Sequence, residues 1–503
     1  MIRRLTTILE FPIHTFLVAL YFILFVYTSN FNSLEFSSTL RIIIVSLICT
    51  AILFFTLKKL FKNAVHAGVF VTFLLFGFFT YGLFYNNLEK LYYAGFWPFK
   101  NIHRYEVIGF VAFYLFMFVW ILLTKRKLIR VNRFLNLLFI CLLAINVLTI
   151  GFYTLKRSTL NEAPLENVYL SDFKKKQVKK PKFAARKLPD IYYIILDGYA
   201  NQRTLTKYYN YDNSQFVNYL KGRGFYIADS SQTNYPVTSL SLSSSLNLNY
   251  LDIQDEQSAK MPLEHLIAQN LATYIFKQHG YKIINISSGY NVTRKLELAD
   301  KTYDLHGPNE FERSILRSGI FRLDDLTGFM AYYRLKEQFQ NMTEAIKEQG
   351  PKFTFVHIVC PHPPFVFKSD GSLNLHTISD LAWSPKEDYV EQLAYVNRVA
   401  KNYIDEIFYN SAVEPIIILQ SDHGPWMESN SRENSYESRS YILNAFRLPA
   451  SIKDKLYDSI SPVNCFRFID THVLNDTIPL LLDKPLERKT LYANPIFKNY
   501  VND

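Results

Sequence analysis

Cysteine is scarce in this chain, with four residues among 503. So few cysteines exclude the disulfide framework typical of small secreted proteins, and their spacing carries no zinc-binding pattern. Cys49 and Cys141 lie in apolar runs, where we expect free thiols buried in a membrane. Cys360 and Cys465 lie in the polar part of the chain, where we expect no bridge, although the sequence leaves that pairing open.

Phosphate-binding glycine loops are also missing. The sequence contains neither G-x-x-x-x-G-K-[ST] nor G-x-G-x-x-G, which excludes the common nucleotide-binding motifs. The formal net charge of +11 at first suggests a nucleic-acid partner. However, residues 1–157 carry 16 Lys and Arg against 4 Asp and Glu, whereas the remainder carries 39 against 40. We therefore assign the positive charge to membrane topology and expect no binding of nucleic acid.

Charged residues are sparse in the first third of the chain, where long apolar runs take their place. Each run is close to the length that crosses about 30 Å of hydrocarbon, so we predict five transmembrane helices. The runs occupy residues 11–28, 40–57, 67–85, 107–123 and 135–155.

The charges that flank these runs orient them in the membrane. Lys and Arg gather before the first run, after the second and after the fourth, whereas the loop after the first run has none. The positive-inside rule then places the N-terminus in the cytoplasm, and five spans place everything after residue 157 outside the cell membrane. We predict a multi-pass protein of a bacterial inner or plasma membrane. Its parts are a transmembrane domain at 1–157, a basic juxtamembrane linker at 158–189 and an extracytoplasmic domain at 190–503.

The lysine-rich linker has two interpretations. It is either a solvated connector or a basic segment that rests on anionic headgroups. Beyond it, buried strand patterns alternate with loops and helices, at 191–196, 283–286, 353–359 and 416–419. This alternation predicts a largely parallel sheet with helices on both faces, in which ligands bind beyond the carboxyl ends of the strands.

Polar side chains follow three of these strands. Asp197 follows the first strand, His362 comes shortly after the strand at 353–359, and Asp422 and His423 follow the last strand in a Ser-Asp-His-Gly turn. Carboxylate oxygens and neutral imidazoles are ligands for divalent cations. An isolated Asp-His-Gly is also compatible with an ordinary polar turn, so a metal site requires residues from other loops.

A further loop supplies hydroxyl groups. Residues 234–247 alternate Ser with Leu too regularly for a flexible linker, which favours a helix that begins near Thr238, shortly after Pro236. Free N–H groups at a helix start stabilise developing negative charge. Thr238 and its neighbour Ser239 could exchange roles. We favour Thr238 as the nucleophile because Ser239 is explained as a helix-start hydroxyl.

Over residues 190–440 these motifs resemble the alkaline phosphatase superfamily. Within it they resemble the membrane-anchored sulfatase-like branch that contains lipoteichoic acid synthases and lipid A phosphoethanolamine transferases. The resemblance implies a five-helix transmembrane bundle followed by a sulfatase-like (alkaline phosphatase-type) α/β domain with a largely parallel central sheet. It also implies a divalent metal, Mn²⁺, Zn²⁺ or Mg²⁺, whose ligands are Asp197, Thr238, Asp422 and His423.

Two more residues match the branch. His362, in the Pro-His-Pro-Pro-Phe of 361–365, looks like the family histidine that contacts substrate or assists the leaving group, the alternative being a histidine held in a proline-rich turn. Arg294 is similar to a substrate-binding arginine of the lipoteichoic acid synthases, the alternative being an ordinary surface arginine. True sulfatases carry a C-x-P-S-R motif that this chain lacks, which disfavours sulfate ester hydrolysis.

The resemblance implies transfer of a phosphoglycerol- or phosphoethanolamine-type headgroup. The donor is a phospholipid, the acceptor an envelope glycan or lipid, and the intermediate a phospho-threonine on Thr238. Water as the acceptor would instead make the protein a membrane-anchored phosphodiesterase, phosphatase or sulfatase-like hydrolase. A catalytically dead membrane scaffold is the non-enzymatic alternative, and a transport role is weakened because the apolar runs carry almost no central charge.

Overall fold

The computed structural model divides into two compact units. The first contains Met1–Ala163 and Pro308–Leu323, and the second contains Pro164–Gly307 and Asp324–Asp503. Most of the predicted linker at 158–189 lies outside the described residues, although Val168–Lys176 of it forms helix α7. The structure describes residues 10–31, 36–96, 98, 102–159, 167–176, 188–251, 262–319, 324–376, 383–427, 432–474, 476 and 478–484.

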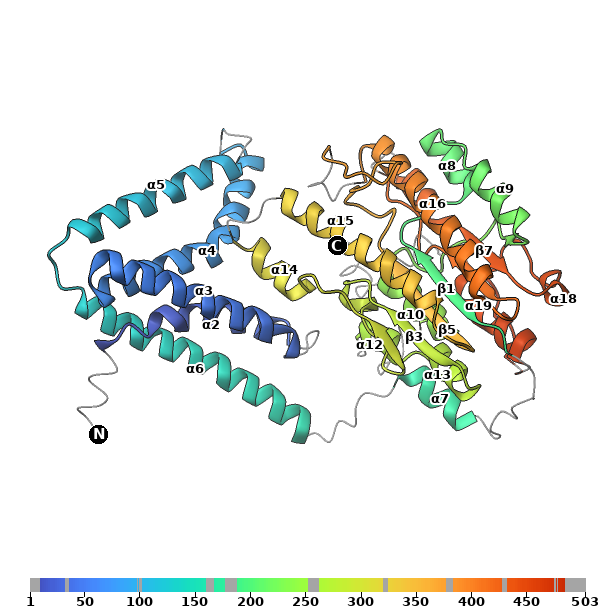
Figure 1. The fold of residues 1–503 in the computed structure, drawn as a ribbon, viewed down its shortest axis with the longest axis horizontal. Helices are drawn as coiled ribbons and strands as arrows, with labels where there is room; N and C mark the ends of the chain where they lie inside the picture. The colour runs from blue at the N-terminus through green and yellow to red at the C-terminus, as the bar shows by residue number, and fades with distance from the viewer. Residues whose placement is uncertain are drawn as a thin grey trace. The chain divides into compact units, whose positions relative to one another are not determined.

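The first unit is built from apolar helices (Figure 1). They are α2 (His14–Ser29), α3 (Ser37–Phe61), α4 (Ala64–Tyr93), α5 (Ile102–Leu123) and α6 (Ile129–Thr159). Within the described residues, four of them, α3 to α6, are long and apolar enough to cross a membrane. Helix α2 has 16 residues, which span about 24 Å against about 30 Å of hydrocarbon. The predicted five spans are thus corrected to four helices of spanning length and one shorter apolar helix.

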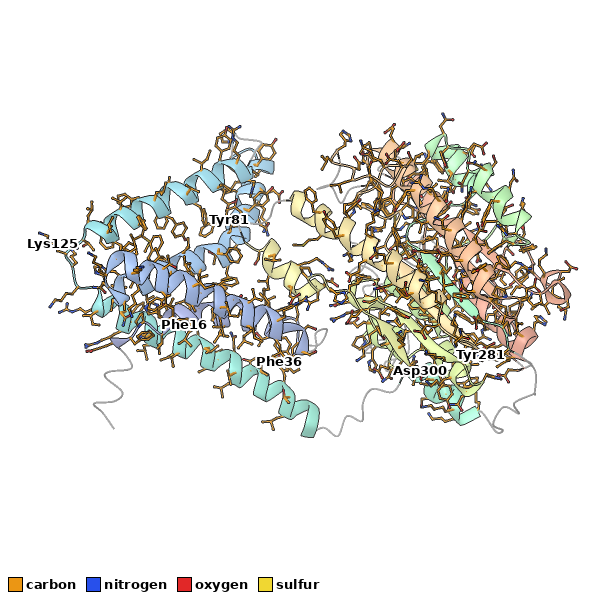
Figure 2. The ribbon with its side chains drawn as sticks, in the orientation of Figure 1. Phe16, Phe36, Tyr81, Lys125, Tyr281 and Asp300 are labelled. Atoms are coloured by element: carbon orange, nitrogen blue, oxygen red, sulfur yellow. The ribbon has the colours of Figure 1, made fainter. Side chains whose placement is uncertain are left out.

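Aromatic side chains fill much of this unit. Phe16 and Tyr81, both labelled in Figure 2, come from α2 and α4. Tyr81 is fully buried, and its hydroxyl contacts His103 Nδ1 at 2.8 Å. Cys49 and Cys141 are free thiols on the exposed surfaces of α3 and α6, whereas Cys360 and Cys465 are buried and, as expected, unbridged.

Helix α14 (Glu310–Arg317) belongs to the first unit, although the residues on both sides of this insert belong to the second. Its apolar residues Phe311 and Ile315 form one cluster with Ile23 and Tyr27 of α2. Glu312 is buried; it closes the capping box of α14 and forms an ion pair with Arg41 of α3. The insert lies within residues 190–503, which the sequence patterns predicted as the extracytoplasmic domain, and those patterns carried no signal for it.

The Arg41–Glu312 ion pair should contribute measurably to the stability of the first unit. Arg41→Ala leaves a buried carboxylate without its cation, so we expect a loss of about 2 kcal/mol. Arg133→Ala is the matched control because Arg133 and its partner Glu10 are both more than half exposed, and such a pair contributes less than about 1 kcal/mol. Thermal unfolding of the full chain in detergent measures both losses. Equal losses in the two variants would show that Glu312 does not depend on Arg41.

The second unit is organised around a seven-stranded sheet in the order β2-β7-β6-β1-β5-β3-β4. The strands β6, β1, β5, β3 and β4 are parallel neighbours, whereas β7 is antiparallel to both β6 and β2. The sheet is therefore mixed, which corrects the prediction of a largely parallel one at its β7 and β2 edge. The strands are β1 (Ile191–Leu196), β2 (Tyr226–Ile227), β3 (Lys282–Ile286), β4 (Lys301–Tyr303), β5 (Lys352–Ile358), β6 (Ile416–Gln420) and β7 (Asn444–Arg447).

Helices cover both faces of this sheet. Tyr192, Ile194 and Leu196 of β1 pack in the core under α15 (Asp324–Ile346) and α16 (Lys386–Asn410), the two long helices that cross the sheet in Figure 1. The alternate residues of β1 pack in a second core. That core includes residues of α10 (Thr238–Leu246), α13 (Leu271–Gln278) and α19 (Pro462–Ile469). A strand buried on both faces must be apolar throughout, which explains the continuous Ile-Tyr-Tyr-Ile-Ile-Leu run of β1.

The remaining helices of the second unit are short. The structure has α8 (Gln202–Tyr209), α9 (Ser214–Gly222), α12 (Leu263–Ala268), α17 (Arg432–Ser440) and α18 (Ala450–Lys453), with helical turns at Asn291–Thr293 and Asp470–Leu474. Asp470, at the start of the last turn, is buried, and neither of its carboxylate oxygens has a hydrogen-bond partner among the described residues. Burial, and then the charge of Asp476, raise the pKa of Asp470 well above its usual value.

This raised pKa makes Asp470 a pH-dependent cost to folding. The folded state holds the Asp470 proton more tightly than the unfolded chain, so stability falls as pH rises from the usual value of 3.8 towards the raised one. The loss is up to about 1.4 kcal/mol per pH unit within that window. Asp470→Asn removes this cost, so its gain in melting temperature should be larger at pH 8 than at pH 5. Asp405→Asn on the exposed face is the control, and equal gains for Asp470→Asn at both pH values would contradict the assignment.

Candidate metal and phosphoryl site

Three neighbouring parallel strands deliver side chains to one place in the second unit. The strands β6, β1 and β5 are adjacent and run in the same direction, so their carboxyl ends meet at one edge. Asp197 directly follows β1, and Asp422 and His423 follow β6 after a single serine; all three are buried. Gly424 comes next, and a Cβ there would run into the carbonyl oxygen of Ser438. The glycine of the Ser-Asp-His-Gly turn is thus required by close backbone approach.

Thr238 is the first residue of helix α10, and Val237 before it is extended. Its Oγ1 lies 3.2 Å from His423 Nε2. The helix is fixed to the β6 turn close by, because Ser241 Oγ donates to the carbonyl oxygen of Asp422 at 2.8 Å. Ser239, the alternative nucleophile, is buried, but its hydroxyl is not among the groups that contact His423 in the described part of the chain. The structure therefore brings Thr238 to the ends of the strands.

The donor set at this place fits a divalent cation. Asp197 Oδ1 and Asp422 Oδ2 are buried and have no hydrogen-bond partner among the described residues. They lie 3.5 and 3.4 Å from His423 Nε2. His423 Nδ1 lies 3.0 Å from the carbonyl oxygen of Gly424, which can only accept, so Nδ1 carries the proton and Nε2 presents its lone pair. Two carboxylate oxygens, one imidazole nitrogen and the Thr238 hydroxyl suit Mn²⁺, Zn²⁺ or Mg²⁺.

The pKa values of the two carboxylates, Asp197 and Asp422, are shifted in opposite directions. Burial and the charge of Asp197 raise the pKa of Asp422 to about 7. Burial also opposes ionisation of Asp197, but the nearby His362 and the hydrogen bond from His357 outweigh it and hold the pKa of Asp197 below its usual value. Burial holds the pKa of His423 well below its usual value. A neutral His423 beside an ionised Asp197 is the protonation state that metal binding requires.

His357 is a candidate site residue that no sequence pattern predicted. It lies inside β5 and is fully buried. Its Nε2 is 3.2 Å from Asp197 Oδ2, and its Nδ1 is 2.8 Å from the hydroxyl of Thr293. Asp197, His357 and Asp422 form a group that could hold a metal ion, with ligand atoms within 4.8 Å of one another. A histidine inside a strand that is buried on both faces was the available signal.

His362 lies beside the site. Its Nδ1 is 2.7 Å from the carbonyl oxygen of Pro363, so Nε2 is the nitrogen free to exchange a proton. Its ring is centred 6.3 Å from that of His423 and packs edge-on against Trp383 at 4.8 Å. Burial lowers the pKa of His362, although the charge of Asp197 opposes this shift.

The structure does not bring Arg294 into contact with these residues. Its guanidinium, about a third exposed, pairs with Asp304 at 3.6 Å, and its carbonyl oxygen accepts from Asn285. A different arginine, Arg439 on α17, is present instead. Arg439 Nη2 lies 3.1 Å from His423 Nε2. No sequence signal pointed to it, because an arginine 16 residues beyond His423 on a polar helix belongs to no motif.

Comparisons with known proteins find similar chains among solved structures. No protein-family model matches the chain, and no curated relative matches it either. Among solved structures, the chain is similar to phosphoethanolamine transferases and to sulfatases. Phosphoethanolamine transferases are among the proteins that the sequence motifs resemble.

Three of these structures illustrate the similarity. The periplasmic domain of EptC from Escherichia coli is 15% identical with a TM-score of 0.40, over 60% of this chain and 90% of that one. The integral membrane phosphoethanolamine transferase EptA from Neisseria meningitidis is 12% identical with a TM-score of 0.38, over 91% of this chain and 93% of its own. BT1596, a 2-O glycosaminoglycan sulfatase, is 10% identical with a TM-score of 0.39, over 61% of this chain and 75% of its own. At such low identity, the roles of individual residues must rest on the geometry of this chain.

Proposed function

We propose that this protein transfers a phosphoglycerol- or phosphoethanolamine-type headgroup from a phospholipid to a glycan or lipid acceptor of the cell envelope. The observation that carries the proposal is the convergence of Thr238 Oγ1 on His423 Nε2, beside two buried carboxylate oxygens without hydrogen-bond partners among the described residues. A threonine hydroxyl is a weak nucleophile, and a divalent cation held by Asp197, Asp422, His423 and Thr238 would lower its pKa and offset phosphoryl charge.

The reaction needs two displacements. In the first, Thr238 Oγ1 forms a bond to phosphorus and the bond to the diacylglycerol oxygen breaks, so the threonine proton ends on diacylglycerol. In the second, the acceptor hydroxyl attacks the phospho-threonine and its proton returns to Thr238. His362 Nε2 is the group we assign to carry these protons, because Nδ1 is held by Pro363 and the ring lies next to His423.

The membrane half fits this chemistry. Four helices of spanning length would hold the site at a membrane surface, where the lipid donor is present at high local concentration. We place the N-terminus in the cytoplasm and the site on the extracytoplasmic side. This topology needs an odd number of spans, so it requires that the shorter helix α2 crosses the membrane together with α3 to α6. The domain boundaries at 157 and 190 remain part of this proposal.

The experiment that tests the proposal follows both halves of the reaction. Protein purified from its native membrane is analysed by mass spectrometry for a phosphoglycerol or phosphoethanolamine adduct on Thr238. The same protein is then incubated with labelled phosphatidylglycerol or phosphatidylethanolamine, with and without an envelope extract as acceptor. An adduct together with a labelled acceptor product supports transfer. Diacylglycerol release with water-soluble label alone would assign a hydrolase, and neither product would leave the scaffold interpretation.

A further inference from the structure

Arg439 is held in place by two fixed backbone groups. Its Nε donates to the carbonyl oxygen of Pro236 at 2.7 Å, and its Nη1 donates to that of Gly424 at 3.0 Å. Trp383 and Trp426 lie against the guanidinium, with ring centres 5.5 and 5.9 Å away. These contacts fix the plane of the guanidinium, so the direction of its remaining N–H groups is set in advance.

The third contact of Arg439 is with the nitrogen that a metal would use. His423 Nδ1 carries the ring proton, so the Nε2 lone pair accepts from Arg439 Nη2 at 3.1 Å and contacts Thr238 Oγ1 at 3.2 Å. A single lone pair cannot bind a metal ion and accept a strong hydrogen bond at the same time. A cation that coordinates Nε2 therefore displaces the Arg439 N–H from it. A guanidinium beside a bound cation is repelled by it, and an anionic ligand that accepts the displaced N–H reduces this repulsion.

We propose that Arg439 makes metal binding and phosphoryl binding depend on each other. The guanidinium competes with the metal for His423 Nε2, and an anionic phosphoryl oxygen resolves that competition by accepting the displaced N–H. The contacts of Arg439 and Thr238 share His423 Nε2, so the guanidinium is within reach of a phosphoryl group on Thr238. Planar guanidinium N–H groups match the geometry of phosphoryl oxygens. This inference rests on the proposed metal-assisted site and adds to it a residue that couples the binding of its two ligands.

The proposal is tested by binding alone, without turnover. Calorimetric titration measures the affinity of the full-length protein for Zn²⁺ with and without sn-glycerol 3-phosphate, and the affinity for the phosphate ester with and without Zn²⁺. In the unmodified protein, each ligand should raise the affinity for the other by about tenfold. The two factors should be equal because thermodynamic linkage is reciprocal. Arg439→Gln should bind Zn²⁺ alone more tightly and lose most of the mutual effect, keeping only the part that comes from direct attraction between the metal and the phosphate.

Two further variants keep the result interpretable. Arg439→Lys retains a charge without the planar fork, so we expect most of the mutual effect to be lost while the fold, followed by thermal unfolding, is kept. Arg223→Gln, at a surface pair with Asp405, is the control and should behave like the unmodified protein. An unchanged mutual effect in Arg439→Gln would overturn the proposal. Absence of the effect in the unmodified protein would overturn it as well.

The test of Arg439 can fail while the test of headgroup transfer succeeds, and the reverse is also possible. If ligand binding is mutually dependent but no headgroup is transferred, Arg439 couples the two ligands and the transferase assignment fails. If a headgroup is transferred and the mutual effect is the same in Arg439→Gln as in the unmodified protein, the transferase assignment stands and the coupling role of Arg439 fails.

Discussion

Replacement of Thr238 by alanine should lower headgroup transfer by about a thousandfold or more, which is the scale on which loss of a nucleophile acts. The physical reason is that Thr238 Oγ1 is the hydroxyl in contact with His423 Nε2, next to the two buried carboxylates. The measurement is transfer of label from phospholipid to acceptor, together with loss of the adduct from residue 238.

Two matched variants decide between neighbouring hydroxyls. Thr238→Ser keeps an attacking oxygen at the start of α10 and should retain part of the activity. Ser239→Ala should stay within a few-fold of the unmodified protein, because Thr238 and not Ser239 supplies the hydroxyl that contacts His423. If Ser239→Ala were the inactive variant and Thr238→Ala the active one, the nucleophile would have to be reassigned to Ser239.

Loss of bound metal is the second large effect we expect. Asp422→Asn and His423→Gln each remove a ligand from a set whose two buried carboxylate oxygens have no other partner among the described residues. Metal affinity should therefore fall by at least about a hundredfold, beyond the range known for outer-shell changes. Elemental analysis of protein equilibrated in a metal buffer measures the stoichiometry directly. The fold should survive in both variants because the replacements are close in shape.

The control for these metal measurements is a surface carboxylate. Asp304 is more than half exposed, and Asp304→Asn should bind as much metal as the unmodified protein. The same loss in all three variants would indicate non-specific binding to carboxylates. Unchanged stoichiometry in Asp422→Asn would show that the metal is held elsewhere.

The strands that carry the site were predictable because they are buried on both faces. The runs at 191–196 and 416–419 became β1 (Ile191–Leu196) and β6 (Ile416–Gln420) almost without shift. The β7 and β2 edge was not predicted, because a two-residue strand such as Tyr226–Ile227 has no periodicity to detect. The first apolar run, at 11–28, begins before helix α2, which starts at His14. The length of this helix was overestimated because apolar composition extends beyond the residues that are helical.

The site was predictable where residues stand directly after strands. Asp197, Asp422 and His423 have this position, and Thr238 was indicated by the proline and the Ser-Leu alternation around it. His357 and Arg439 were missed because their roles depend on which atoms they face. The sequence does not show that His357 contacts Asp197 or that Arg439 contacts His423. Only the fold brings these pairs together. Arg294 shows the opposite case, in which a local likeness was not accompanied by contact.

Helix α14 has a practical consequence for anyone who wishes to crystallise the second unit alone. An expression fragment that begins at residue 164 would include Pro308–Leu323, and with it Phe311 and Ile315, whose apolar neighbours on α2 would be gone. Such a fragment would expose an apolar surface to other copies of itself and should aggregate. Substitution of that stretch by a short glycine-serine bridge should give a soluble, monodisperse fragment.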